Sequence, residues 1–458
     1  MTTEAIPADA PLIPVEDRPF FGQPRGLAYL AFTEAWERFS YYGMTSLVVL
    51  YMVGQLLLPG HVENVAGFAG FRSFIEGLFG PMSDQALASQ IFGLYTGFVY
   101  LTPVIGGWIG DRVLGTRNTV IIGALLMVGG HFAMAFDHSF LLALLLLVIG
   151  TGCLKGNISA QVGALYPVAD EGGRTRGFAI FSMAINFGAI AGPLVCGLLA
   201  QIYGWHLGFG LAGVLMLMAL VTYLLGYKHL PANAPRHADA EEGAKLTREE
   251  WRVIAALVAV MGITIFQSIA YYQISNVGLV WIEQWVDLRL FGLDVPVPWF
   301  ASLDPLASVI CVPFLFALWR RQAAKGGEPG DLAKIATGAF LCAASNLVLM
   351  VAALTAGGGK VSILWPIVYC IGIGVAFIYY WPTLLALVSR AAPASVNSTM
   401  MGVAFCSLFI GNNIIGTIGG WYHDMGPVAF WGMHAAIAGV GGLLAILFLR
   451  PLSRRLTT

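Results

Sequence analysis

Four charged side chains lie inside segments of the sequence that are otherwise apolar. Glu34, Glu37 and Arg38 fall within one such segment near the N-terminus, and Lys155 falls within another. The spacing places Glu34, Glu37, Arg38 and Tyr41 on one face of a helix, because residues three or four apart are neighbours there. An anionic group that occupied the cations would free a glutamate to take up a proton. The alternative is a buried ion-pair network that only holds the helices together.

The composition indicates that lipid, rather than water, surrounds most of the chain. Of 458 residues, 58% are hydrophobic and only 11% are charged, whereas a soluble domain needs a charged and polar exterior. A formal net charge of −1 leaves no basic face for a nucleic-acid partner. The six cysteines are single residues without a Cys-x-x-Cys pair, so we expect neither a metal site nor disulfides. The sequence contains no nucleotide-binding loop and no set of catalytic residues that would indicate an enzyme.

Twelve apolar segments are long enough to cross a bilayer as helices, which needs about 20 residues each. One long charged stretch, residues 231–251, divides them into two sets of six. This layout is typical of transporters with a substrate site between two six-helix halves. We therefore expect an all-α membrane protein with a cytoplasmic segment 1–26, a bundle 27–227, a linker 228–250, a bundle 251–449 and a tail 450–458. The expected spans are 27–57, 88–109, 117–136, 139–165, 175–203, 205–227, 251–286, 297–320, 330–356, 361–390, 397–422 and 427–449.

Lysine and arginine are distributed unevenly between the loops that alternate along these spans. Only Arg72, Arg289 and Lys360 fall in loops on one side, whereas the termini, the linker and the other loops carry the remaining basic residues outside the spans. Basic residues concentrate on the cytoplasmic side of membrane proteins. We therefore expect a multi-pass protein of the cytoplasmic (inner) membrane with both termini in the cytoplasm.

The residues around Glu34 form a motif. EAWERFSYYG, residues 34–43, resembles the E-x-x-E-R-F-x-Y-Y-G motif on the first helix of the proton-dependent oligopeptide transporters (POT/PTR), a branch of the major facilitator superfamily. Further segments of both halves resemble that family in the same order: GGWIGDRVLGTR (106–117), TGCLKGNISAQVG (151–163), RGFAIFSMAINFGAIAGP (176–193) and PASVNSTMMGVAF (393–405). The resemblance implies the major facilitator superfamily fold, with twelve transmembrane helices in two bundles.

The resemblance also implies roles for individual residues. Arg38 and Lys155 match the basic residues that receive the carboxylate of a peptide, and Glu34 and Glu37 match the pair implicated in proton binding and coupling. The residues that match polar contacts to the peptide backbone are Tyr41, Tyr42, Tyr100 and Asn186, with Tyr95 close to Tyr100 as the alternative.

Three positions depart from the family pattern. Phe377 stands where the tenth helix usually carries a glutamate for the amino terminus of the substrate, and Tyr272 replaces an acid that often precedes a glutamine on the seventh helix. SLDPL, residues 302–306, replaces the usual S-L-N-P and adds Asp304. We expect Asp304 to accept the amino terminus or to pair with Lys155; the alternative is a capped helix start with Pro305 in the first turn.

The sequence thus predicts a proton-coupled symporter that imports di- and tripeptides by alternating access. Its expected partners are short peptides, protons as the coupling ion and membrane lipid; no nucleic acid, metal or other cofactor is expected, and no oligomer is required. A carrier of another small anionic or zwitterionic solute, or of a drug, is the alternative within the same fold, because Phe377 and Tyr272 replace expected acids.

Overall fold

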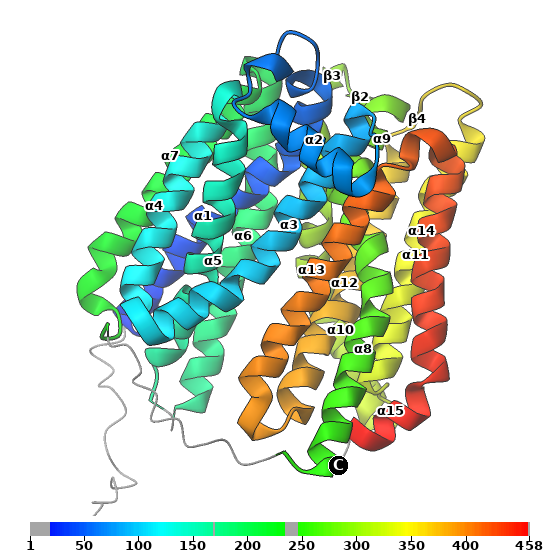
Figure 1. Ribbon diagram of the computed structural model, residues 1–458. Helices are drawn as coiled ribbons and strands as arrows, with labels where there is room; N and C mark the ends of the chain where they lie inside the picture. The colour runs from blue at the N-terminus through cyan, green and yellow to red at the C-terminus, as the bar shows by residue number, and fades with distance from the viewer. Residues whose placement is uncertain (1–18, 168–169, 234–245, 457–458) are drawn as a thin grey trace, which may run out of the picture.

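The computed structural model describes residues 19–167, 170–233 and 246–456. Twelve long helices dominate this part of the chain, in two groups of six (Figure 1). The first group is α1 (Arg25–Tyr51), α3 (Asp84–Ile109), α4 (Thr116–Met134), α5 (Phe140–Ala164), α6 (Glu171–Tyr203) and α7 (Trp205–Gly226). The second group is α8 (Arg248–Tyr272), α10 (Leu303–Ala324), α11 (Asp331–Thr355), α12 (Leu364–Ala391), α13 (Asn397–Gly419) and α14 (Tyr422–Leu447). This is the architecture expected from the sequence.

The long helices match the hydrophobic thickness of a bilayer. In the described residues, eleven helical segments are long and apolar enough to cross a membrane by length and composition. The other long helix, α1, has 27 residues, and its hydropathy is lowered by polar side chains that include Glu34, Glu37 and Arg38. All three of these side chains are buried. A helix of this kind stays in the membrane because its charges face protein rather than lipid.

Glycines allow the helices within each half to pack closely. A Cβ atom on Gly106 of α3 would lie 2.0 Å from the carbonyl oxygen of Gly152 on α5, and one on Gly43 of α1 would lie 2.5 Å from Sγ of Cys196 on α6. Small residues at helix contacts let the backbones approach one another in membrane proteins. The glycines therefore position α5 and α1, the helices that carry Lys155 and Arg38.

Several shorter elements were not expected from the sequence. The predicted span 251–286 is not one continuous helix: α8 ends at Tyr272, the 3-10 turn Gln273–Ser275 follows, and α9 (Val277–Trp285) starts after Asn276, whose φ of −106° and ψ of −104° break the helix. Short helices α2 (Phe68–Phe79) and α15 (Leu449–Leu456) flank the bundles. β1 (Val286–Asp287) pairs in parallel with β4 (Val361–Ser362), and β2 (Arg289–Leu290) pairs antiparallel with β3 (Leu293–Asp294).

The short helical segments between the long helices are π-helical or 3-10. The π-helical ones are η2 (Met52–Leu56) and η4 (Gly110–Leu114). The 3-10 ones are η3 (Val62–Asn64), η5 (Asp137–Ser139), η6 (Tyr227–His229), η7 (Gln273–Ser275), η8 (Val297–Ser302) and η9 (Ala394–Val396).

The two halves meet at one end of the molecule. We call the end at which α1 starts and α14 stops the base, and the opposite end, with α2, α9 and the strands, the top (Figure 1). A Cβ atom on Gly93 of α3 would lie 2.6 Å from Cα of Gly416 on α13, so these helices touch through their backbones. In the upper part, Nε1 of Trp299 donates to the carbonyl oxygen of Leu194 at 2.8 Å. Toward the base the groups of helices diverge in Figure 1.

Candidate functional site

A cavity of about 500 Å³ lies between the two halves. Residues of α1, α3, α5 and α6 line it from the first half, and residues of α8, α10, α12 and α13 line it from the second. Most of the site residues predicted from the sequence lie on its wall: Glu34, Arg38, Tyr41, Tyr42, Tyr100, Lys155, Asn186 and Asp304. The interface between two bundles is where transporters of this architecture hold their substrates.

The two glutamates of α1 have different environments. Arg38 holds Glu37 through two hydrogen bonds, from Nε to Oε2 and from Nη2 to Oε1. Glu37 is fully buried and is absent from the residues that line the cavity. Glu34 lines the cavity; its Oε1 lies 3.3 Å from Nε of Arg38, whereas its Oε2 is buried without a hydrogen-bond partner among the described residues. The pair expected from the motif therefore consists of one tightly paired carboxylate and one that is partly free.

Close helix packing holds Arg38 in this position. A Cβ atom on Gly188 of α6 would lie 2.6 Å from Cβ of Arg38, so α6 presses directly against the backbone of α1 at this point. The guanidinium group also lies 5.0 Å from the centre of the Tyr41 ring. Arg38 is thus fixed by a carboxylate, an aromatic ring and a neighbouring helix, and it reaches the cavity from a rigid support.

Lys155 reaches the cavity from α5 of the first half. Its Nζ lies 4.7 Å from the centre of the Tyr100 ring, within the range of a cation–π interaction. No carboxylate in the described part of the chain lies within salt-bridge distance of it. Tyr100 lines the cavity and Tyr95 does not, so the structure places Tyr100, and not its neighbour, beside the lysine.

The second half contributes one carboxylate. Asp304 lies in the first turn of α10, and the hydroxyl of Tyr271 donates a hydrogen bond to its Oδ2. The ring of Phe377, from α12, stacks on Tyr271 with centroids 5.1 Å apart and planes 26° apart, and Tyr272 meets Tyr271 edge-on at 4.8 Å. Asp304 forms no ion pair with Lys155 or with another cation in the described residues, so its charge has no protein counter-ion there.

Tyr271 is a site residue that the sequence did not indicate. It lies beside Tyr272 in the segment AYYQ. Both rings reach the cavity wall from the last turn of α8, as Tyr41 and Tyr42 do from the middle of α1. No sequence pattern singled out Tyr271, because its contact with Asp304 depends on how α8 and α10 pack.

The site holds no candidate metal centre within residues 19–167, 170–233 and 246–456. No group of three or more His, Cys, Asp or Glu side chains in these ranges is arranged to hold a metal ion. The ionisable groups of the cavity wall are Glu34, Arg38 and Lys155 in the first half and Asp304 in the second. Cations on one wall and a carboxylate on the other are suited to bind a solute that carries both charges.

The chain is similar to known membrane transporters in sequence and in fold. The family model PTR2, described as POT family, matches residues 117–245 and 239–425. The uncharacterized transporter YclF of Bacillus subtilis is 30% identical over 96% of this chain and 96% of that protein. A di-/tripeptide transporter of Lactococcus lactis is 27% identical over 95% of this chain and 97% of its own length. The crystal structure of a mutant peptide transporter POT in complex with alafosfalin superposes with a TM-score of 0.85 at 27% identity, covering 96% of this chain and 97% of that one.

Proposed function

This chain belongs to the POT family of membrane transporters, and from that premise we propose that it is a proton-coupled symporter that imports di- and tripeptides by alternating access. Relatives that are named as di-/tripeptide transporters support the substrate class. The coupling ion in this proposal is the proton, and no metal or other cofactor takes part. Short peptides, protons and membrane lipid are its partners, and a monomer suffices.

The observation that carries the proposal is the separation of charge across the cavity. Arg38 and Lys155 lie on the wall of the first half, and Asp304 lies on the wall of the second. A short peptide is a zwitterion whose carboxylate and amine are held apart by its backbone. In the proposed complex the carboxylate binds between Arg38 and Lys155, and the amine pairs with Asp304. Bound in this way, the peptide links the two halves.

The polar side chains between the two charged ends support recognition of a backbone. Tyr41, Tyr42, Tyr100 and Asn186 lie on the cavity wall and offer hydroxyl and amide groups to the peptide bond. Side chains of the peptide would lie against the remaining wall. Selection by termini and backbone therefore leaves side-chain identity open, and the proposed substrates are peptides of varied sequence.

Glu34 is the proposed carrier of the coupling proton. The two hydrogen bonds from Arg38 stabilise Glu37 as an anion, because charge-assisted bidentate contacts are strong. Only one carboxylate oxygen of Glu34 lies close to the same arginine, and the other is buried without a hydrogen-bond partner among the described residues. A buried carboxylate in this position is stabilised by protonation. A substrate carboxylate that draws Arg38 away would favour that protonation and so couple the two events.

The closed top supports a state in which the site is reached from the base. Ser302 and Trp299 donate hydrogen bonds to backbone carbonyls of α6 at 2.7 and 2.8 Å, and α3 packs on α13 in the upper half. In the proposed orientation the base faces the cytoplasm, with both termini there and the protein in the cytoplasmic membrane, because basic residues concentrate at that end. The structure would then be the state that releases substrate inward.

A carrier of a different zwitterion or of a drug is the second candidate. The observation that favours it is the aromatic wall of the second half, where Phe377 stacks on Tyr271 and Tyr272 lies next to it. These rings give planar or apolar groups a surface, and Asp304 is the single carboxylate on this wall among the described residues.

The test is uptake of labelled dialanine into liposomes that contain the purified protein, with an inward proton gradient. We expect uptake that depends on the gradient and that unlabelled di- and tripeptides inhibit by competition. Lys155→Ala should weaken this uptake, and Glu34→Gln should abolish it. Gradient-driven uptake of another solute, without competition by peptides, would replace the peptide proposal by the second candidate. Peptide uptake that does not depend on the proton gradient would refute proton coupling.

A further inference from the structure

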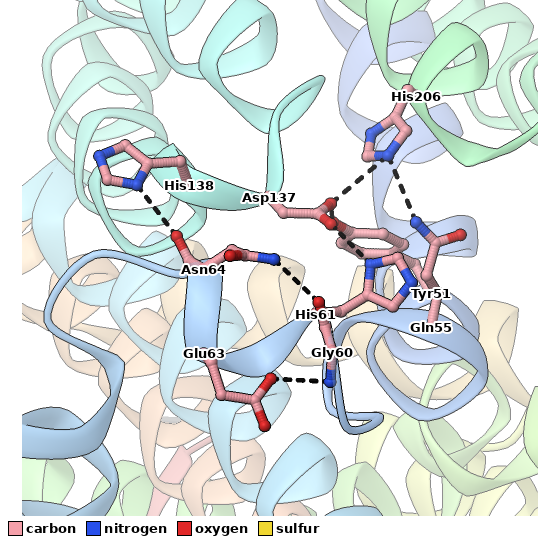
Figure 2. A network of polar contacts seen from close by, with 9 residues as sticks. All are labelled: Tyr51, Gln55, Gly60, His61, Glu63, Asn64, Asp137, His138 and His206. Carbon is pink, nitrogen blue, oxygen red and sulfur yellow. Dashed lines mark hydrogen bonds and ion pairs between the residues drawn. The ribbon is translucent and has the colours of Figure 1, made fainter.

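A second cluster of polar side chains lies at the top of the first half, beyond the cavity-lining residues of α1. Its centre is Asp137, in the turn η5 between α4 and α5 (Figure 2). The hydroxyl of Tyr51, the last residue of α1, donates to Oδ1 of Asp137. Nδ1 of His61 lies 3.0 Å from Oδ2, and Nε2 of His206, near the start of α7, lies 3.4 Å from Oδ1. One carboxylate thus joins α1, the segment after it, the α4–α5 turn and α7.

The cluster brings one carboxylate together with two imidazoles, a kind of side chain that can be either neutral or protonated. Histidine gains or loses its charge between about pH 5 and 8. Both histidine side chains are 43% exposed and Asp137 is 17% exposed, so protons reach the rings from solvent while the carboxylate is partly shielded. An ion pair with Asp137 forms only when a histidine is protonated. Acid at the top therefore strengthens this cluster.

Gln55 gives His206 two alternative arrangements. Nε2 of Gln55 lies 3.3 Å from Nε2 of His206, and Gln55 belongs to the π-helical turn η2 that continues α1. A neutral ring with its proton on Nδ1 can accept a hydrogen bond from the amide at this nitrogen, whereas a neutral ring with its proton on Nε2 donates to Asp137. A protonated ring always carries a proton on Nε2 and can only donate, so the amide then presents its oxygen. Protonation of His206 therefore removes the arrangement in which the ring accepts from the end of α1.

The other titratable groups nearby are engaged elsewhere. Oε2 of Glu63 accepts from the backbone nitrogen of Gly60 at 2.8 Å. Nδ1 of His138 lies 2.9 Å from the carbonyl oxygen of Asn64 and points away from Asp137 in Figure 2. The remaining neighbours of Tyr51 are rings: Phe140, Trp205 and Phe209. His61 and His206 are thus the basic side chains that face Asp137 in the described part of the chain.

We propose that this cluster is a pH-sensitive clamp on the top of α1, which tightens when the outer side is acidic and thereby makes the first half move as one body. The inference rests on the proposed function and orientation, in which the top faces the outside and α1 carries Glu34 and Arg38. The clamp adds a dependence on external pH that is separate from the proton that is transported.

The test compares three proteins: wild type, the double variant His61→Gln/His206→Gln, and the matched control His138→Gln. Dialanine exchange is measured in liposomes with the same pH on both sides, so that no gradient drives it, at about pH 5.5 and about pH 8. The melting temperature of each protein in detergent is measured at the same two pH values. Glutamine keeps a hydrogen-bonding group in place of the ring but carries no charge at either pH.

At about pH 8 the double variant is expected to match wild type, and at about pH 5.5 it is expected to exchange about two- to fivefold more slowly, as for two exposed ion pairs. Its melting temperature should fall by about 2 °C relative to wild type at the acidic pH alone, and His138→Gln should behave as wild type. A ratio between double variant and wild type that is the same at both pH values, in exchange and in melting, would overturn the clamp. If dialanine is not exchanged at all, the peptide proposal fails, and the melting temperatures alone decide on the clamp.

Discussion

Tyr271 donates a hydrogen bond to Asp304 and so joins the end of α8 to the first turn of α10 on the cavity wall. The hydrogen bond comes from a neutral hydroxyl, so the carboxylate of Asp304 still has no counter-ion among the described residues. A buried charge of this kind is costly unless it is paired. The pairing partner in the proposed function is the amine of the substrate.

Replacing Asp304 by asparagine should weaken peptide binding. The loss of a charge-assisted contact to the amine costs about 1.5–3 kcal/mol, so we expect the KM for dialanine to rise about 10- to 100-fold. Wild type should discriminate strongly between dialanine and N-acetyl-dialanine, and the Asp304→Asn variant should not. Tyr271→Phe is the matched control, because it removes one hydrogen bond and keeps the carboxylate. An Asp304→Asn protein with unchanged peptide affinity and pH dependence would show that the residue only starts the helix.

Replacing each glutamate of α1 by glutamine should show that one of them carries the coupling proton and that the other stabilises the fold. Glu34→Gln removes the carboxylate with the unpaired oxygen, so gradient-driven accumulation of dialanine should disappear while exchange without a gradient persists. Glu37→Gln removes one side of a buried ion pair and should destabilise the protein by about 3 kcal/mol, measured as a lower melting temperature. Accumulation by Glu34→Gln that equals wild type would assign the proton to another group.

Lys155 should contribute to peptide binding through its charge and through its contact with the ring of Tyr100. Lys155→Ala is expected to raise the KM for dialanine about 10- to 100-fold, because a charged partner of the substrate carboxylate is lost. Tyr100→Phe keeps the ring that lies 4.7 Å from Nζ and should change the KM little, whereas Tyr100→Leu should raise it about threefold through loss of a cation–π contact. Equal effects of the phenylalanine and leucine variants would mean that the hydroxyl, and not the ring, is what matters.

Two adjacent glycines of α3 offer a test of the packing. A Cβ atom on Gly106 would lie 2.0 Å from the backbone oxygen of Gly152, whereas one on Gly107 would have no heavy atom within 4 Å. Gly106→Ala should therefore force α3 and α5 apart and cost about 1–3 kcal/mol, seen as a melting temperature lowered by several degrees. Gly107→Ala should leave the melting temperature unchanged. Similar melting temperatures for the two variants would contradict the close contact between these helices.

Much of the fold follows from local properties of the chain. Long apolar segments, one charged linker and the motif at residues 34–43 predict two six-helix halves and the family, and the comparisons confirm the family. The predicted seventh span was wrong in one respect. Its apolar run continues through Asn276, so hydropathy alone indicates one helix, whereas the backbone turns there and starts α9.

Local sequence is enough to predict that Glu34, Glu37, Arg38 and Lys155 belong to a polar site, because charges at membrane depth are too costly unless they face one another or a cavity. The packing of the helices adds that Arg38 forms its two hydrogen bonds with Glu37, that Tyr100 lies beside Lys155, and that Tyr271 donates a hydrogen bond to Asp304. These choices depend on how each helix is rotated and how closely glycines let its neighbours approach. The chain segments involved are far apart in sequence, so no local pattern carries that information.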